Sequence, residues 1–170
     1  MGKILKRLSI LLLAIAAGGF LFWGCGDAGC LENRTSTPLI LFYNRNNPSQ
    51  QFSLDSVSVK GIGQPLDSLL LDTARQVSQL RLPLRDDVDS TAYVIRYDWA
   101  NAPLPDTLVF YYQSYPYFAS MDCGCMFNYA LDSVTFTYHL FDSVAVVKPL
   151  IDNQNVENIQ FFYPVPQTVR

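Results

Sequence analysis

Apolar residues recur in short runs after residue 36, and polar or turn-forming residues separate the runs at intervals of roughly 8 to 12 residues. The alternation is clearest in Val134-Thr135-Phe136-Thr137-Tyr138, where Val, Phe and Tyr share one face of an expected strand. Runs of strand length are Leu39–Tyr43, Val57–Lys60, Leu69–Leu71, Val77–Leu82, Ala92–Tyr97, Leu108–Tyr112, Tyr117–Met121, Cys125–Leu131, Val134–Leu140, Val144–Val147 and Ile159–Tyr163. We therefore expect one all-β domain over residues 37–170, an antiparallel, immunoglobulin-like β-sandwich of roughly seven to nine strands. Only Asp72–Gln79 could add a turn or two of helix.

The first 24 residues have a different pattern. Lys3, Lys6 and Arg7 precede the apolar run Leu8–Trp23, as in a cleaved, helical secretory signal. The run is shorter than the roughly 20 residues that a membrane-spanning helix needs. It ends in Leu21-Phe22-Trp23-Gly24-Cys25, which resembles a lipobox, although Trp23 departs from the pattern. The sequence thus predicts a signal peptide over residues 1–24, lipidation of Cys25 and a lipidated tether over residues 25–36.

The residue after the lipidated cysteine bears on the membrane in which the protein resides. Gly26 stands where an Asp would favour retention at the inner membrane, so we expect the outer membrane, with the domain facing the periplasm and the cell surface as the alternative. Without residues 1–24 the chain keeps nine Lys and Arg and 15 Asp and Glu, a formal charge of −6. This scattered, net negative charge disfavours nucleic-acid binding.

Three thiols remain once Cys25 is lipidated: Cys30, Cys123 and Cys125. An oxidising compartment favours a disulfide, and pairing Cys30 with Cys123 would close a loop of about 93 residues, worth roughly 4 to 5 kcal/mol in the chain-entropy model. Cys125 is the alternative partner of Cys30. A second alternative is thiol redox chemistry within Cys123-Gly124-Cys125, although no Lys, Arg or His is adjacent to depress a thiol pKa.

Asp followed by Ser or Thr and then a small or aliphatic residue, or Thr, recurs along the chain. Asp and Ser side chains bond to nearby backbone groups, so each copy is expected at the start of a strand. The pattern also resembles the acceptor motif of the general O-glycosylation system of Bacteroidetes. The candidate acceptors are Ser56, Ser68, Thr73, Ser90, Thr107, Ser133 and Ser143.

Residues for catalysis are few. His139 is the one histidine and is expected in a strand, and no Gly-x-Ser-x-Gly elbow occurs. The acidic segment Asp86-Asp87-Val88-Asp89 lacks the glycine and distal Glu of a calcium-binding EF-hand, so a solvated turn is the better interpretation. We expect no enzyme, no cofactor and no metal.

An aromatic segment is the best candidate for binding. Phe110–Phe118 contains seven aromatic or proline residues in nine. A hairpin around Gln113–Pro116 would bury one set of rings and present Tyr111, Tyr115 and Tyr117 as a surface for sugars or proteins.

Several short segments, in this order, resemble a known family. They are Cys25, Cys30-Leu31-Glu32, Pro38 to Tyr43, the Asp-Ser-Val strands, Asp106-Thr107-Leu108 and Cys123-Gly124. Together they are similar to short Bacteroidetes lipoproteins catalogued as domain of unknown function 6452. In that family an aromatic residue usually follows the late Cys-Gly, so Cys125 is a departure. The resemblance implies no activity.

The leading hypothesis for function is an outer-membrane lipoprotein with a structural or interaction role. Its partners would be the membrane and envelope proteins or glycans. The alternative is a carbohydrate- or ligand-binding module.

Overall fold

The computed structural model describes residues 36–63, 68–97, 104–121 and 123–164, all within one compact unit, Glu32–Arg170. These residues form strands and connections without a helix, which confirms the all-β class. The strands are β1 (Leu39–Asn44), β2 (Asn47–Gln51), β3 (Val57–Ile62), β4 (Leu69–Ala74), β5 (Gln79–Arg81), β6 (Ser90–Arg96), β7 (Asp106–Ser120), β8 (Gly124–Phe136), β9 (Ser143–Val146), β10 (Leu150–Ile151) and β11 (Glu157–Tyr163).

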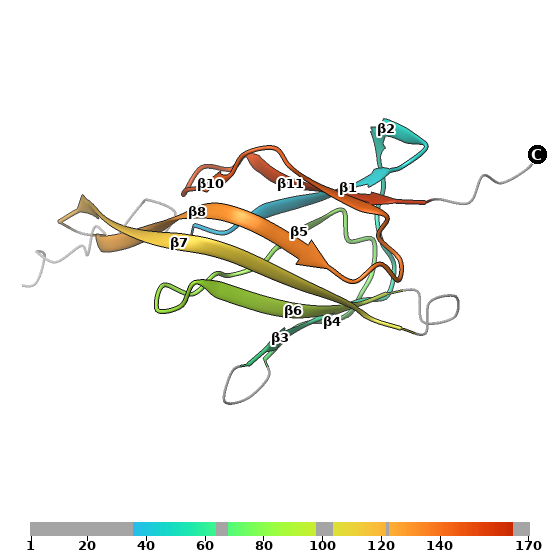
Figure 1. Ribbon diagram of the computed structural model, residues 1–170, viewed down its shortest axis with the longest axis horizontal. Coiled ribbons are helices and arrows are strands. Elements are labelled where there is room, and N and C mark those ends of the chain that lie inside the picture. The colour runs from blue at the N-terminus through green and yellow to red at the C-terminus, as the bar shows by residue number, and fades with distance from the viewer. Residues whose placement is uncertain (1–35, 64–67, 98–103, 122, 165–170) are drawn as a thin grey trace, which may run out of the picture. The chain divides into compact units, whose positions relative to one another are not determined.

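The strands make two sheets, shown as two layers in Figure 1. The first has the order β2-β1-β11-β9, and β5 also pairs with β1. The second has the order β10-β8-β7-β6-β3-β4. The pairing is antiparallel as expected, with one exception, because β1 and β11 run parallel. The part of the chain that the structure describes has no helix long and apolar enough to cross a membrane.

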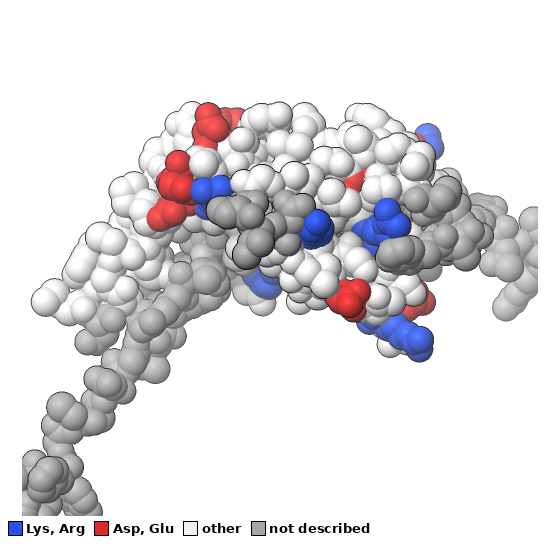
Figure 2. Space-filling view, turned by 90° about the horizontal axis from the view of Figure 1, so that it is seen from below, with Lys and Arg blue, Asp and Glu red and all other residues white. Residues whose placement is uncertain are grey.

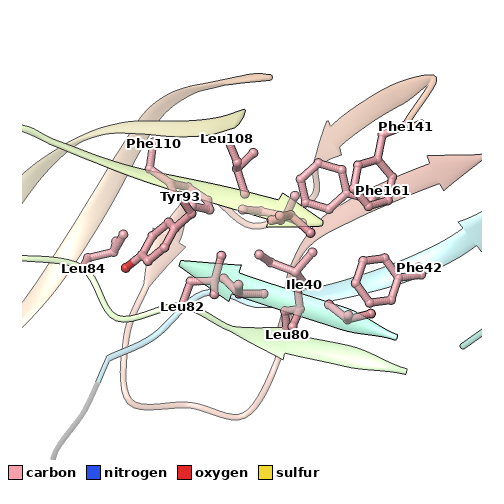
Figure 3. Close-up of a cluster of buried hydrophobic side chains, with 14 of the residues drawn as sticks. Ile40, Phe42, Leu80, Leu82, Leu84, Tyr93, Leu108, Phe110, Phe141 and Phe161 are labelled. Carbon is pink, nitrogen blue, oxygen red and sulfur yellow. The ribbon is translucent and has the colours of Figure 1, made fainter. Parts of the chain in front are cut away.

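The core lies between the sheets, where apolar side chains alternate with polar ones along each strand. Figure 3 shows Ile40 and Phe42 from β1 facing Leu108 and Phe110 from β7, with Phe161 from β11 beside them. Phe42, Phe110 and Phe161 have no exposed surface. Phe161 packs on the ring of Phe141, with ring centroids 4.6 Å apart. Burial of one face of each strand explains why apolar and polar residues alternate in the sequence.

Two differences from the expected strands matter for function. The predicted hairpin around Gln113–Pro116 is wrong, because β7 runs without a turn from Asp106 to Ser120. The two strands expected in Cys125–Leu140 form one strand, β8, which ends at Phe136 rather than Leu140. The register of β7 and β8 shifts once near Asp132, which lies between the paired residues Leu131 and Ser133. A β-bulge absorbs the extra residue without ending the strand.

Smaller differences have local causes. The polar strand β2 and the two-residue β10 were not expected, because neither shows apolar alternation. The predicted helical turn in Asp72–Gln79 is wrong, because β4 continues to Ala74 and β5 begins at Gln79. Thr73 and Gln76 have positive φ angles of 48° and 53°, which break a helix of L-residues. The described residues form eleven strands, which is more than the seven to nine expected from the sequence.

Candidate functional site

The most distinctive feature for function is the outer half of the β7–β8 hairpin. β6 pairs with β7 only as far as Tyr111, and beyond that point β7 pairs with β8 alone, up to Ser120 opposite Gly124. We call residues 112–121 and 123–131 the arm. Figure 1 shows it reaching past the neighbouring strands at the left-hand end. Pro116 fits here because the side of β7 away from β8 has no partner strand, so a missing N–H costs no ladder hydrogen bond.

The three tyrosines predicted as a ligand surface do lie in one row. Tyr111, Tyr115 and Tyr117 are separated by even numbers of residues in β7, so they share one face with Gln113. Tyr111 is 43% exposed and Tyr115 is 48% exposed, whereas Tyr117 is half-buried. The Tyr115 hydroxyl donates to Gln113 Oε1 at 2.9 Å. We call these four residues the tyrosine row.

The apolar residues at the end of the arm were not singled out from the sequence. Phe118 is 61% exposed and Met121 is 90% exposed. Phe118 is an odd number of residues from each tyrosine of the row, so it lies on the opposite face of β7. The sequence signal that could have identified this end is the scarcity of charge in residues 110–131. That segment contains one charged residue, Asp122.

Two cysteines lie at the same end. Cys123 is disulfide-bonded, and Cys125 is an exposed free thiol. The described residues contain only these two cysteines, and no complete bridge is described among them. Cys25 and Cys30 also lie outside the described residues. Lipidation of Cys25 and pairing of Cys30 with Cys123 therefore stay predictions.

The arm contacts the place where the described chain begins. Ser36 is buried, and its hydroxyl donates to Asn128 Oδ1 on β8 at 3.2 Å. Ser36 and Thr37 line a cavity of about 270 Å³ together with Cys123, Cys125 and residues of β8 and of the 83–84 segment. The N-terminal end of the described domain therefore lies against the arm.

A second, apolar cavity of about 460 Å³ is lined by the end of β3, the start of β6 and the 83–85 segment. Gly61, Ile62, Leu70, Leu84 and Tyr93 line it, with Ser68 and Arg85 among the polar residues. The guanidinium of Arg85 binds both carboxylate oxygens of Asp87, at 3.0 and 2.7 Å. The positive charge of Arg85 is therefore already paired with Asp87 beside this cavity.

A buried tyrosine holds the acidic segment 86–89 in place. The Tyr112 hydroxyl lies 2.6 Å from Thr91 Oγ1, donates to the Arg85 carbonyl at 2.9 Å and accepts from the Arg85 N–H at 3.0 Å. The hydrogen bond from Arg85 holds the pKa of the Asp87 carboxyl below its usual range. Within the described ranges no group of three or more His, Cys, Asp or Glu side chains is placed to hold a metal ion.

Asp106 is a buried carboxylate, and its neighbours include the single histidine. It accepts hydrogen bonds from Thr137 Oγ1 at 2.9 Å, from the backbone N–H of His139 at 2.9 Å and from Tyr97 Oη at 3.2 Å. His139 is not in a strand as expected, but in the bend after β8, where its Nδ1 lies 2.8 Å from the Pro105 carbonyl oxygen and 3.3 Å from Asp106 Oδ1. The carboxylate thus fixes the connection that leads from β8 to β9.

The candidate acceptor residues differ in their surroundings. Ser68, Thr73, Ser133 and Ser143 are exposed, whereas Ser56, Ser90 and Thr107 are half-buried. Ser56, Ser90, Thr107 and Ser143 lie at or just before the start of a strand, as the turn chemistry of Asp-Ser predicts. Ser133 instead follows the β8 bulge and lies opposite Tyr111.

A family model described as a family of unknown function, DUF6452, matches residues 56–163. This segment is more than half of the chain. The chain belongs to the DUF6452 family. The DUF6452 match covers every strand of the six-stranded sheet and the whole arm, whereas β1 and β2 precede it. No curated protein and no solved structure matches the chain. The family description names no activity.

Proposed function

We propose that this DUF6452 chain is a non-enzymatic envelope lipoprotein of a Bacteroidetes bacterium with a binding or structural role. Cys25 would carry the lipid, with the domain at the periplasmic side of the outer membrane. The basic residues before the apolar run, the short length of that run and the cysteine at its end support export and anchoring. The two packed sheets support the β7–β8 hairpin, and the arm of that hairpin presents side chains to possible partners.

The observation that carries the binding role is the tyrosine row. Tyr111 and Tyr115 keep nearly half of their surface exposed, although large aromatic side chains gain free energy when they are buried. Gln113 lies between them and offers an amide to a polar partner. Outward tyrosines on a rigid strand supply contact area at a low cost in conformational entropy. The partner would be an envelope protein or a glycan.

A photocrosslinking experiment tests the binding role. A benzophenone amino acid is placed at Tyr115 in the full-length protein in cells, and the same substitution at Tyr138 is the control. Tyr138 is 75% exposed but lies after β8, far along the hairpin from the row. We expect a discrete crosslinked envelope component from position 115 and not from position 138. Equal labelling at the two positions would argue against a specific surface.

Carbohydrate binding is the alternative role, and the exposed tyrosines beside Gln113 favour it. Flat aromatic rings with an adjacent amide can stack on sugar faces and bond to hydroxyl groups. Binding to an array of envelope glycans and to isolated peptidoglycan should fall at least tenfold when Tyr111, Tyr115 and Tyr117 are changed to Ala. Binding that survives the three changes would exclude this role for the row.

The covalent chemistry is a separate part of the proposal. We propose a Cys30–Cys123 disulfide, with Cys125 as the alternative partner of Cys30. The other alternative is thiol redox chemistry within Cys123-Gly124-Cys125, which requires a Cys123 that is not permanently paired with Cys30. Glycosylation is most accessible at Ser68, Thr73, Ser133 and Ser143, which are exposed. Mass spectrometry of the mature protein reads the lipid on Cys25, the disulfide and any glycans together. A stable Cys30–Cys123 bridge in all molecules would rule out the redox role, and a mature N-terminus other than lipidated Cys25 would rule out the anchor.

A further inference from the structure

The arm lacks charged side chains over a length that is unusual for a protein surface. None of the described residues in 110–121 and 123–131 is Asp, Glu, Lys, Arg or His. In Figure 2 the left-hand end, which the arm forms, shows neither the blue nor the red of charged residues. Charged side chains are what most often keeps a protruding β-hairpin from associating with apolar surfaces. The described residues of the arm have no charged side chains to prevent such association.

Large apolar side chains are exposed at the end of the arm. Phe118 and Met121 keep 61% and 90% of their surface in contact with solvent. Phe118 lies opposite Cys125, which is also exposed. We call Phe118, Met121 and Cys125 the tip. The tip leaves the tyrosine row free, because Phe118 lies on the other face of β7.

The chain enters the domain beside this arm. Ser36 bonds to Asn128, and Ser36 and Thr37 share a cavity with Cys123 and Cys125. Cys25 precedes Ser36 by eleven residues, which can span at most roughly 40 Å when fully extended. A lipid on Cys25 therefore places the arm within reach of the bilayer.

We propose that the tip inserts into the interface of the membrane that holds the lipidated Cys25. The partner is a lipid surface, and the inference rests on the proposed anchor. Aromatic and apolar side chains favour the boundary between headgroups and acyl chains. A shallow insertion needs no spanning segment. Two attachments, the lipid and the tip, would fix the orientation of the sandwich and point the tyrosine row sideways along the membrane.

The free thiol of Cys125 allows a direct test. The mature lipidated protein is labelled at Cys125 with the environment-sensitive dye NBD and reconstituted into vesicles of phosphatidylethanolamine and phosphatidylglycerol. Some vesicles also contain a lipid with a doxyl quencher near the glycerol backbone. We expect NBD emission at shorter wavelength than in detergent-free buffer, together with quenching by the doxyl lipid. The double change Phe118→Ser and Met121→Ser should remove most of the shift and of the quenching.

The control and a second readout separate the tip from the anchor. Tyr138→Ser removes an aromatic ring that is 75% exposed and lies outside the arm, and it should leave the NBD signal unchanged. Flotation of the vesicles reports the anchor and should be lost in Cys25→Ser. Protein that floats through Cys25 but shows unshifted, unquenched NBD overturns the insertion of the tip and leaves the anchor intact. Protein that is lipidated at no position and does not float overturns the anchor and the insertion with it.

Discussion

Asp106 shows how much a single residue can contribute to this fold. Its carboxylate is 1% exposed and accepts hydrogen bonds from a threonine hydroxyl, a tyrosine hydroxyl and backbone N–H groups of residues 139–141. Such a carboxylate replaces its lost hydration with fixed donors. The sequence places Asp106 in an Asp-Thr pair at the start of a strand, and that position is confirmed. Its burial depends on a bend more than thirty residues later in the chain.

We expect Asp106→Ala to lower the free energy of unfolding by about 3 kcal/mol, because hydrogen bonds to a charged group contribute roughly 1.5 to 3 kcal/mol each and are not additive. Urea unfolding followed by circular dichroism measures the change. The matched control is Asp142→Ala, whose carboxylate pairs with an exposed Arg45 at 2.6 Å. Exposed ion pairs contribute about 0 to 1 kcal/mol. Equal losses in the two variants would show that Asp106 does not organise the bend.

At the scale of elements, the β7–β8 hairpin differs most from its prediction. Pro116 is a turn-forming residue in isolation, yet it sits within β7 opposite Phe127. The strand tolerates it because that part of β7 has one partner only. The true turn includes Met121 and Cys123, and Gly124 follows with φ of +71°. A sequence that contains both kinds of turn signal does not reveal which one the pairing with β8 will use.

Gly124 is where the left-handed backbone requires glycine. A Cβ at this position would meet no atom within 4 Å, so the cost of a side chain is conformational rather than steric crowding. We expect Gly124→Val to lower the free energy of unfolding by about 1 to 2 kcal/mol, as measured by urea denaturation. Gly124→Asn is the matched control and should cost less, because Asn tolerates this conformation better. A larger loss for Asn than for Val would contradict this explanation.

At the scale of the whole molecule, the two sheets enclose several tyrosines whose hydroxyl groups are tied to the protein. Burial, reinforced by the nearby Asp106 carboxylate, raises the pKa of Tyr97 above its ordinary value. Burial also raises the pKa of Tyr93, whose hydroxyl donates to the Pro83 carbonyl, and that of Tyr129. The folded protein therefore keeps these protons at a pH where the unfolded chain releases them.

Stability should consequently fall in alkali. Unfolded tyrosines ionise near pH 10, so the contribution of the raised pKa values is complete below that pH and is lost as the pH rises above it. Each such tyrosine adds a slope of about 1.4 kcal/mol per pH unit above pH 10. Urea unfolding at several alkaline pH values measures this slope, and Tyr97→Phe should remove the contribution of one tyrosine from it. A flat profile from pH 9 to pH 11 would refute the linkage.

The sequence by itself determined which residues form strands and which face the core, because period-two alternation records burial on one side of a sheet. Leu39–Tyr43, Val57–Lys60, Ala92–Tyr97 and Ile159–Tyr163 all lie in or overlap strands of the structure. The even spacing of Tyr111, Tyr115 and Tyr117 likewise suffices to place them on one face. These properties are local, so a short window of residues contains them.

Only the tertiary structure decided which strands pair and which side chains are left uncovered. The parallel pairing of β1 with β11, the continuity of β7 through Pro116 and the burial of Asp106 each depend on residues distant in sequence. Phe110 and Phe118 occupy the same face of β7, yet the first is fully buried and the second is exposed. The difference arises because the first sheet covers the inner part of the hairpin and does not reach its tip. Burial depends on how far the opposing layer extends, and no local pattern encodes that distance.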